Sequence, residues 1–345
     1  MADNGRSGIG PWLDRPAGGG NHMHSPRVSI GVPVYNGQKY IGATLDSLIA
    51  QTCSDIEIIV TDNCSTDATP QIVQSYAGRD PRVIYLRNVA NLGPARNYNS
   101  SLAAARGEYF KWCSSDDVCA PDFVEKCVAV LDADPAVVLA YPRTSIIDSA
   151  GTIVGQYQYE LDFDDPDAYL RYSRIINVNH HAHGAYELYG VMRLDALRAA
   201  GGMRTHVRGD SVLLARLLLR GRFRRIEEHL FFNRDHTDRS SRYLARQRVR
   251  AGSRLSRYLG CGPLPSAEWW DEKMRGKIVF PEWRVLGEYA RAAHEAPLSA
   301  MQRLGSYVAL GLFAVWHVPK LGRDVIIAVE QTLNQLLDSV RPLAK

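Results

Sequence analysis

Two adjacent carboxylates, Asp116 and Asp117, follow the short apolar run 109–112. Neighbouring carboxylates on one loop repel each other unless a cation or hydrogen-bond donors compensate their charge. Mg²⁺ and Mn²⁺ prefer oxygen ligands and often bind one or two carboxylates together with the phosphates of a substrate. The pair therefore indicates either a metal and phosphate site or the solvent-facing start of a helix ahead of Pro121.

Polar loops follow three other apolar runs in the same way. Residues 33–37, 62–67 and 88–97 come at the ends of the runs 28–34, 56–61 and 83–86. Asp and Asn are common turn residues, so any one of these loops could be purely structural. In an open α/β sheet, however, ligands bind beyond the carboxyl ends of the strands. Because four such loops would meet at one edge, we expect a ligand cleft there.

The elements that position these loops alternate between apolar, β-branched runs and helix-like segments. The expected strands are 28–34, 56–61, 83–86, 109–112 and 137–141, and the expected helices are 40–50, 69–76, 94–104 and 121–131. This order predicts an α/β fold with a Rossmann-like, mostly parallel sheet flanked by helices on both faces.

After residue 141 the pattern changes. Residues 145–158 predict two strands around a Ser-Ala-Gly turn, and the later segments predict helices at 194–200 and 210–219 and strands at 223–226 and 230–232. Residues 240–345 predict a mainly helical region. Its most apolar run, 304–318, is shorter than the roughly 20 residues of a membrane-spanning helix, so we expect a buried or interfacial helix.

Several classes of protein are disfavoured by missing motifs. The sequence contains no GxxxxGK[ST] motif and no GxGxxG after the first expected strand, which argues against P-loop ATPases and classical dinucleotide dehydrogenases. Its six cysteines form no CxxC pair, and their apolar neighbours indicate buried thiols in a reducing compartment. Residues 1–26 lack the apolar core of a secretory signal, and we interpret them as a flexible, glycine-rich segment.

The net charge of +4 is distributed unevenly. Residues 239–345 contain 17 Lys and Arg against 9 Asp and Glu, whereas residues 1–238 contain 24 against 28. A basic region that also carries tryptophans and an apolar run indicates peripheral contact with a membrane, although packing on the catalytic domain or in a homodimer explains it as well. We expect no nucleic-acid partner.

The sequence resembles family 2 glycosyltransferases of GT-A fold in the segments VSIGVPVYNGQKYIGATLDSLIAQT, IEIIVTDNCSTDAT and NLGPARNYNSSLAAARGEYFKWCSSDDVCAPDF. The resemblance covers residues 27–141 and continues more weakly to about residue 241 through LYGVMRLDALRAAGGM, RGDSVLLARLLLRGRF and HLFFNRDHTDRSS. It implies a nucleotide-sugar-binding half 27–141 and an acceptor-binding half 142–240 with the catalytic base. On either side of these, composition and pattern predict a flexible segment 1–26 and a helical C-terminal region 241–345.

The resemblance also implies an activity and a cofactor. A nucleotide-diphosphate sugar would bind with Mn²⁺ or Mg²⁺, and a hydroxyl of a glycan or glycolipid acceptor would displace the nucleotide in one inverting step. Asp62 would contact the base, and because a carboxylate accepts the imide N–H of uracil or thymine, UDP- and dTDP-sugars are favoured over GDP-sugars. Such an enzyme is expected in the cytoplasm, or peripherally at the inner face of the membrane.

Individual roles follow from the matching positions. The implied donor-binding residues are Pro33, Tyr35, Asp62, Asn91, Gly93, Arg96, Ser115, Asp116 and Arg234. The implied metal ligands are Asp117, Asp116 and His236, with Asp117 as the direct ligand and Asp116 nearer the ribose. Ser114 stands where many relatives carry another Asp, so the metal site would have one carboxylate fewer. Asp210, at the start of the later helix, would be the general base.

A cluster of aromatic side chains precedes the implied base, and we interpret it as an acceptor-binding loop of His180, His181, His183 and Tyr186. Three histidines within four residues do not easily close on one zinc ion without further ligands. Two alternatives to a glycosyltransferase stay open. A nucleotidyltransferase would need a basic loop after the first strand, which 33–37 lacks, and a degenerate scaffold would not need to keep Asp116 and Asp210.

Overall fold

The computed structural model describes residues 25–159, 161–180, 182–239 and 267–340, and for Glu268, Trp269, Glu272 and residues 338–340 it describes the backbone only. The flexible segment expected at 1–26 therefore lies almost entirely outside the described residues, as does His181.

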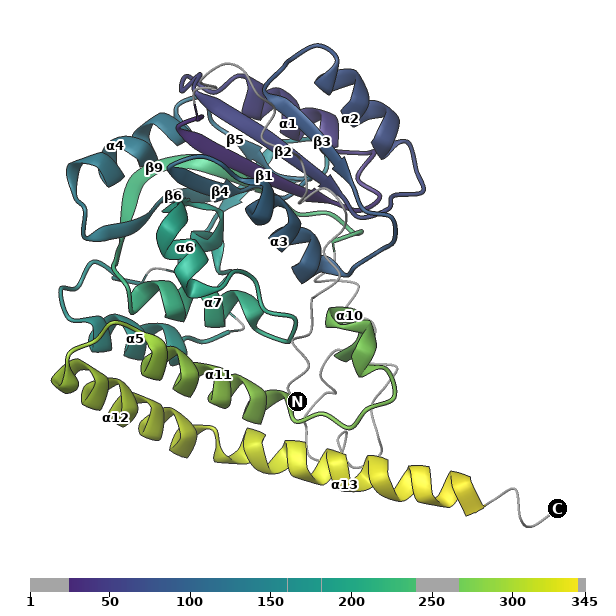
Figure 1. Ribbon diagram of the computed structural model, residues 1–345, viewed down its shortest axis with the longest axis vertical. Coiled ribbons are helices and arrows are strands. Elements are labelled where there is room, and N and C mark those ends of the chain that lie inside the picture. Colours follow the sequence, from purple (N-terminus) through teal and green to yellow (C-terminus); the bar gives the residue numbers. More distant parts are fainter. Residues whose placement is uncertain (1–24, 160, 181, 240–266, 341–345) are drawn as a thin grey trace, which may run out of the picture.

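One mixed sheet of nine strands forms the centre of the molecule (Figure 1). Its first half contains the parallel strands β1 (Val28–Val34), β2 (Ile56–Asp62), β3 (Val83–Arg87) and β4 (Tyr109–Trp112), in the order β3-β2-β1-β4. The predicted strands agree with these to within one residue. Because the chain moves outward from β1 in opposite directions, the carboxyl ends of β1 and β4 form the point at which such sheets bind ligands.

The second half of the sheet mixes strand directions. It contains β8 (Val191–Arg193), β6 (Val137–Ile147), β9 (Arg222–Arg234) and β5 (Val118–Cys119), with β7 (Ile153–Gln156) paired to β6. β8 runs antiparallel to β4 and β6, and β9 runs parallel to β6. The strands predicted at 223–226 and 230–232 are one strand, β9, although its pairing with β6 shifts register between Ile226 and His229 and again before Phe231. β6 also crosses the expected boundary at residue 141, so both halves share one sheet.

Helices cover both faces of the sheet, as predicted. Helices α1 (Ile41–Ile49), α2 (Thr69–Ala77) and α4 (Phe123–Ala133) lie on one face, and α3 (Pro94–Ala104), α5 (Ala168–Ile176), α6 (Leu194–Ala200) and α7 (Gly209–Leu218) lie on the other. Each face of the sheet has its own hydrophobic core. Successive side chains of a strand point to opposite faces, so Ile58 and Val60 lie in one core and Ile59 lies in the other.

The C-terminal region adds a second layer of helices beneath α5 and α7 (Figure 1). It consists of α10 (Ala267–Trp270), the 3₁₀ turn η3 (Glu272–Met274), α11 (Pro281–Glu295), α12 (Ala300–Trp316) and α13 (Val318–Val340). Tyr289 and Phe313 join the core on the α3 side, where the Tyr172 hydroxyl donates to the Tyr289 carbonyl at 2.8 Å. Within the described ranges, no helix has both the length and the apolar character needed to cross a bilayer.

Close contact between α3 and β1 positions the third polar loop. A Cβ atom added to Gly31, in the middle of β1, would lie 2.4 Å from the Ser101 hydroxyl of α3. We expect Gly31→Ala to lower the free energy of unfolding by about 1–3 kcal/mol in urea titrations, because the added methyl overpacks this contact. Gly155→Ala on β7, where a Cβ would meet nothing within 4 Å, is the matched control and should leave it unchanged.

Candidate active site

Asparagine side chains join the loops that follow β1, β2 and β3. Asn63 donates to Asn91 Oδ1 at 2.7 Å and accepts from the Leu92 amide at 2.8 Å. Asn97 of α3 donates to the carbonyls of Thr61 and Val34, at 2.9 and 3.4 Å. These bonds fix the loops at the carboxyl edge relative to one another. The sequence argument assigned no role to Asn63 or Asn97, because Asn after a strand is an ordinary turn residue.

Backbone strain marks the same edge. Within the described part of the chain, the non-glycine residues with positive φ are Asn36, Cys64, Ala185 and Arg208. Asn36 and Cys64 lie in the loops after β1 and β2, and Arg208 lies immediately before α7. Such conformations cost free energy and are often found at functional sites.

The Asp117 carboxylate is fully buried and links the loop after β4 to the end of β9. Its Oδ1 accepts from the Asn233 side chain at 3.0 Å and from the Arg234 amide at 2.9 Å. Its Oδ2 is buried and has no hydrogen-bond partner among the described residues. Burial raises the pKa of the Asp117 carboxyl well above its usual value, and the charge of Asp116 adds to this.

Asp116 is the more accessible carboxylate of the pair, with 28% of its side chain exposed. Its Oδ2 lies 2.9 Å from Nε2 of His236, which follows β9. The His236 ring packs against Tyr40 with the ring centroids 4.7 Å apart, and Nδ1 accepts from the Asp238 amide at 3.3 Å. The structure thus brings together two predicted metal ligands that are 120 residues apart in the sequence.

Arg239 is a site residue that the sequence argument did not single out. Although burial works against it, the pKa of Arg239 is raised by the nearby Tyr186, Asp117 and Asp116. Its guanidinium pairs with Asp235 at 3.7 Å, and its charge also acts on both carboxylates of the loop after β4. The only signal in the sequence was its place three residues after His236.

The predicted donor-binding residues divide into accessible and buried groups. Tyr35 is half-exposed, Asn91 is exposed, and Gly93, Arg96 and Ser115 are partly buried at the carboxyl edge. Ser115 lies against the loop after β1, since a Cβ on Gly37 would be 3.4 Å from its hydroxyl. Arg96 reaches the C-terminal region, where its guanidinium pairs with Asp271 at 3.1 Å.

Three predicted donor contacts are buried in this arrangement. Pro33 lies inside β1, and Asp62 is fully buried, with its oxygens accepting from the Ser65 amide at 2.8 Å and the Tyr85 hydroxyl at 2.7 Å. Arg234 donates to the carbonyls of Asp116 and Asp148 at 2.8 and 3.0 Å. These internal bonds hold Asp62 and Arg234 in the loops of the carboxyl edge, and the donor contacts expected of the two residues stay predictions.

Asp210 lies in the first turn of α7, partly buried, and its Oδ1 accepts from the Ser211 amide at 2.8 Å. The segment before α7 is held against α3, because the Asn99 side chain donates to the Met203 carbonyl and accepts from the Met203 amide, both at 2.8 Å. Asp210 therefore follows a segment attached to the same helix that carries the third polar loop.

Arg208 connects the start of α7 to the C-terminal helices. Its guanidinium pairs with the buried Glu282 of α11 at 3.0 Å, and Arg323 of α13 approaches the same oxygen at 3.4 Å. The Glu282 amide donates to Asp324 of α13 at 2.6 Å. The C-terminal region thus fixes the helix that carries the predicted base.

The residues predicted to bind the acceptor are used mainly inside the protein. The buried His183 contacts both carboxylate oxygens of Glu187, at 3.1 and 3.0 Å, and the Tyr186 hydroxyl donates to Asn233 Oδ1 at 3.1 Å. Burial, to which the charge of Arg208 adds, lowers the pKa of His180 to about 3, so this ring is neutral at neutral pH. His183 and Tyr186 are thus held by other side chains of the protein, and their contact with an acceptor stays a prediction.

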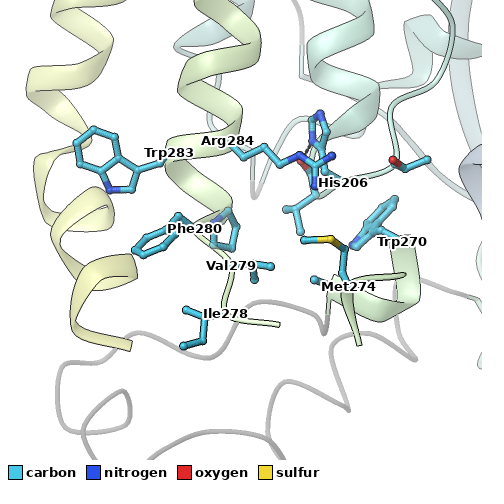
Figure 2. Close-up of a pocket in the computed structure, with 12 residues that line it drawn as sticks. His206, Trp270, Met274, Ile278, Val279, Phe280, Trp283 and Arg284 are labelled. Carbon is cyan, nitrogen blue, oxygen red and sulfur yellow. Dashed lines mark hydrogen bonds between the residues drawn. The ribbon is translucent and has the colours of Figure 1, made fainter. Parts of the chain in front are cut away.

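An apolar pocket of about 400 Å³ lies beside the segment that leads to Asp210 (Figure 2). His206 and Val207 form one wall, and α10, η3 and the start of α11 supply the others, including Trp270, Met274 and Trp283. Trp270 adjoins Asp271, the partner of Arg96. The pocket therefore lies between the segment that leads to α7 and the part of the C-terminal region that pairs with Arg96.

The family model for glycosyl transferase family 2 matches residues 29–199, which include β1 to β4, the Asp116–Asp117 loop and α6. Residues 29–199 form a glycosyltransferase family 2 domain. This confirms the resemblance inferred from the strand-end motifs.

The curated relatives align with this chain over only part of their own length. An uncharacterized glycosyltransferase from Rickettsia typhi is 37% identical over 154 residues, which are 44% of each chain. Chondroitin synthase from Escherichia coli is 34% identical over 129 residues, which are 37% of this chain and 19% of that one. The chain thus spans less than half of the length of these relatives.

Solved structures share the fold of this glycosyltransferase. The crystal structure of S. aureus TarS 1–349 in complex with UDP-GlcNAc matches with a TM-score of 0.51 and 19% identity, covering 79% of this chain and 82% of that one. The corresponding complex with UDP has a TM-score of 0.50 and 20% identity, covering 82% and 89%. The predicted GT-A fold is therefore confirmed.

The chemistry of the side chains at the carboxyl edge fits a divalent cation only in part. Asp116 offers a carboxylate, His236 offers an imidazole, and Oδ2 of the neighbouring residue Asp117 is a buried acceptor without a partner among the described residues. Across the described ranges, no group of three or more His, Cys, Asp or Glu side chains is arranged to hold a metal ion. A cation at Asp116 and His236 would need oxygens of the bound diphosphate to complete its coordination.

We expect the free energy of unfolding to depend both on the hydrogen bonds of Asp117 and on its charge. Asp117→Ala leaves the donors of Asn233 and Arg234 without their acceptor, and we expect the free energy of unfolding to fall by about 1–3 kcal/mol in urea titrations without metal. Asp117→Asn keeps an acceptor oxygen without a buried charge and should cost much less. Asp116→Asn, at the more exposed position, is the matched control.

The pH dependence gives a second measurement on the same variants. A carboxyl whose pKa is higher in the folded protein binds more protons when folded, so the free energy of unfolding decreases as pH rises through the interval between its two pKa values. Asp117→Asn lacks this ionisation. Relative to the parent, it should therefore gain stability as pH rises above about 4. Equal losses in Asp117→Asn and Asp117→Ala at all pH values would show that the charge itself stabilises the fold.

Proposed function

We propose that this glycosyltransferase transfers a sugar from a nucleotide-diphosphate sugar to a hydroxyl of a glycan or glycolipid acceptor, with inversion. One observation carries the proposal: Asp116 and His236, from opposite halves of the sheet, meet at 2.9 Å at the carboxyl edge. In a sheet with this strand order, that edge is where ligands bind.

The donor would lie across the accessible loops after β1, β3 and β4. Tyr35 offers an exposed ring for the base or ribose, and Asn91 and Ser115 offer hydrogen-bonding groups on either side. UDP- or dTDP-sugars are our preferred donors, and the complexes of TarS with UDP and UDP-GlcNAc support a uridine nucleotide in a protein of the same fold. With Asp62 buried, selection of the base would depend on the loop that Asp62 holds rather than on Asp62 itself.

The cofactor would be Mn²⁺ or Mg²⁺, held by Asp116 and His236 in place of the hydrogen bond that joins these two side chains, with Nε2 of His236 unprotonated. This geometry favours Asp116 over the buried Asp117 as the direct ligand, in contrast to the expectation from the sequence. When bound, the cation would neutralise charge on the leaving diphosphate. Arg239, whose charge acts on the same carboxylates, would keep the site close to neutral and would add a donor for phosphate oxygens.

Asp210 would act as the general base. The acceptor hydroxyl would attack the anomeric carbon of the donor sugar while its proton passes to the Asp210 carboxylate. The bond from that carbon to the diphosphate oxygen breaks at the same time, and the nucleoside diphosphate leaves with the electron pair. The attachment of the Met203 segment to Asn99 supports this role, because it holds the start of α7 against the helix of the donor loop.

The alternatives are less well supported. A nucleotidyltransferase is not favoured by the family match, and a scaffold without activity would not need Asp116, His236 and Arg239 to converge. We propose a cytoplasmic location, since all five described cysteines are free thiols, as expected in a reducing compartment.

Donor binding should depend on Asp116. Mn²⁺ with UDP-, dTDP- and GDP-sugars should raise the melting temperature of the parent, because a ligand that binds only the native state stabilises it. We expect the largest shift with a UDP- or dTDP-sugar, and loss of its Mn²⁺ dependence in Asp116→Asn and His236→Ala. Asp122→Asn is the control, because Asp122 is a partly exposed carboxylate directly before α4 that pairs with Lys126. An unchanged Mn²⁺-dependent shift in both variants would rule out this metal site.

Transfer should depend on the Asp210 carboxylate without a change in donor affinity. Asp210→Asn keeps the shape of the side chain but cannot take up a proton, so the transfer rate should fall by roughly 10²–10⁴ in a radiolabelled-sugar assay. The matched control is Asp195→Asn, because Asp195 also lies in a first helical turn and accepts from the next amide, at 2.6 Å. Near-parental transfer by Asp210→Asn would place the base at another residue.

A further inference from the structure

The outer face of α12 and α13 is uncharged and mostly apolar, with exposed polar residues only within 331–335. Every exposed residue from 300 to 337 is uncharged. Fourteen large hydrophobic side chains there are at least 39% exposed, and we call this set the apolar face: Met301, Leu304, Tyr307, Val308, Leu312, Val315, Trp316, Val318, Val325, Ile326, Val329, Leu333, Leu336 and Leu337. Exposed patches of this extent are unusual on a monomer that is surrounded by water.

Three charged residues of these helices lie on their inner side. Arg323 and Asp324 contact Glu282, and Arg303 donates to the Ala296 carbonyl. Surface helices normally place charge toward water and apolar residues toward the core. In α12 and α13 the inner side forms ion pairs and part of the core, whereas the outer side carries no charge.

Cations border the apolar face. Lys273, Arg275 and Lys277 are all exposed on the short segment after α10. This segment lies beside α13, because the Gln335 side chain donates to the Gly276 carbonyl at 3.4 Å. Trp283, 47% exposed at the pocket rim in Figure 2, also meets α13 and donates to the Leu321 carbonyl at 3.1 Å. The border is thus basic and aromatic.

We propose that the apolar face docks on an anionic lipid bilayer, with α12 and α13 lying in the interface and Lys273, Arg275 and Lys277 meeting the headgroups. Interfacial helices need an apolar side for the acyl boundary and cations for anionic lipids, and both are present. In Figure 1 the two helices follow each other along one edge of the molecule, with the sheet on the opposite side, which suits a flat partner.

A second copy of this chain fits the surface less well. In a symmetric dimer the same patch pairs with itself, so the basic border of one copy would approach that of the other. An anionic bilayer instead neutralises the border. The inference concerns binding alone and does not depend on the proposed sugar transfer.

Co-sedimentation of the full chain with vesicles tests this inference. We expect binding to vesicles of phosphatidylglycerol and phosphatidylcholine in equal parts, weaker binding to phosphatidylcholine alone, and loss of the difference at high salt. Leu312→Glu and Val329→Glu should each weaken binding at least about tenfold. Each change removes an aliphatic group that would be buried in the bilayer and places a charge there instead. Lys273→Glu combined with Lys277→Glu should abolish the preference for anionic vesicles.

Val154→Glu on β7 is the matched control, since Val154 is 62% exposed but lies outside the apolar face. It should bind vesicles as the parent does, and all variants should keep the parental melting temperature because the substituted side chains are exposed. The inference fails if the parent stays in the supernatant with both vesicle types, or if Leu312→Glu binds as well as Val154→Glu. It also fails if the parent is a stable dimer that Leu312→Glu dissociates, because the surface would then join two copies.

Discussion

The buried carboxylate of Asp117 is the constraint on which the site depends. A buried charge must be supplied with hydrogen-bond donors, and both donors come from the end of β9, through the Asn233 side chain and the Arg234 amide. That pairing sets the end of β9 against the loop after β4, which in turn places His236 next to Asp116. Two halves of the sheet that are far apart in the sequence are thereby joined at the edge where the donor is expected.

A second dependence runs through the C-terminal region. Arg208 has a positive φ immediately before α7, and its guanidinium is held by the buried Glu282. The same glutamate is approached by Arg323, and its amide is bound by Asp324. The helix with the proposed base is therefore positioned by α11 and α13, which lie outside the residues matched by the family model. The proposed membrane surface and the proposed reaction centre would be parts of one rigidly connected arrangement.

Much of the fold was predictable because the N-terminal half follows simple rules. Alternating apolar strands and helices placed β1 to β4 and α3 almost to the residue, and the resemblance brought Asp116 and His236 into one site. Side chains whose partners lie far along the chain were not predictable in the same way. Nothing local shows that Asp62 is bonded by Tyr85, or that Arg234 is held by main-chain carbonyls. The sequence predicted two short strands in place of β9, because the charged residues in its middle interrupt the apolar pattern, although pairing with β6 resumes beyond them.

A crystal structure of the chain with Mn²⁺ and UDP, with anomalous scattering recorded for manganese, tests the central claim most directly. Our account predicts a manganese peak within coordination distance of the Asp116 carboxylate and the His236 imidazole, with diphosphate oxygens completing the coordination and the uridine lying over Tyr35. A manganese peak elsewhere, or UDP bound at another edge of the sheet, would contradict it.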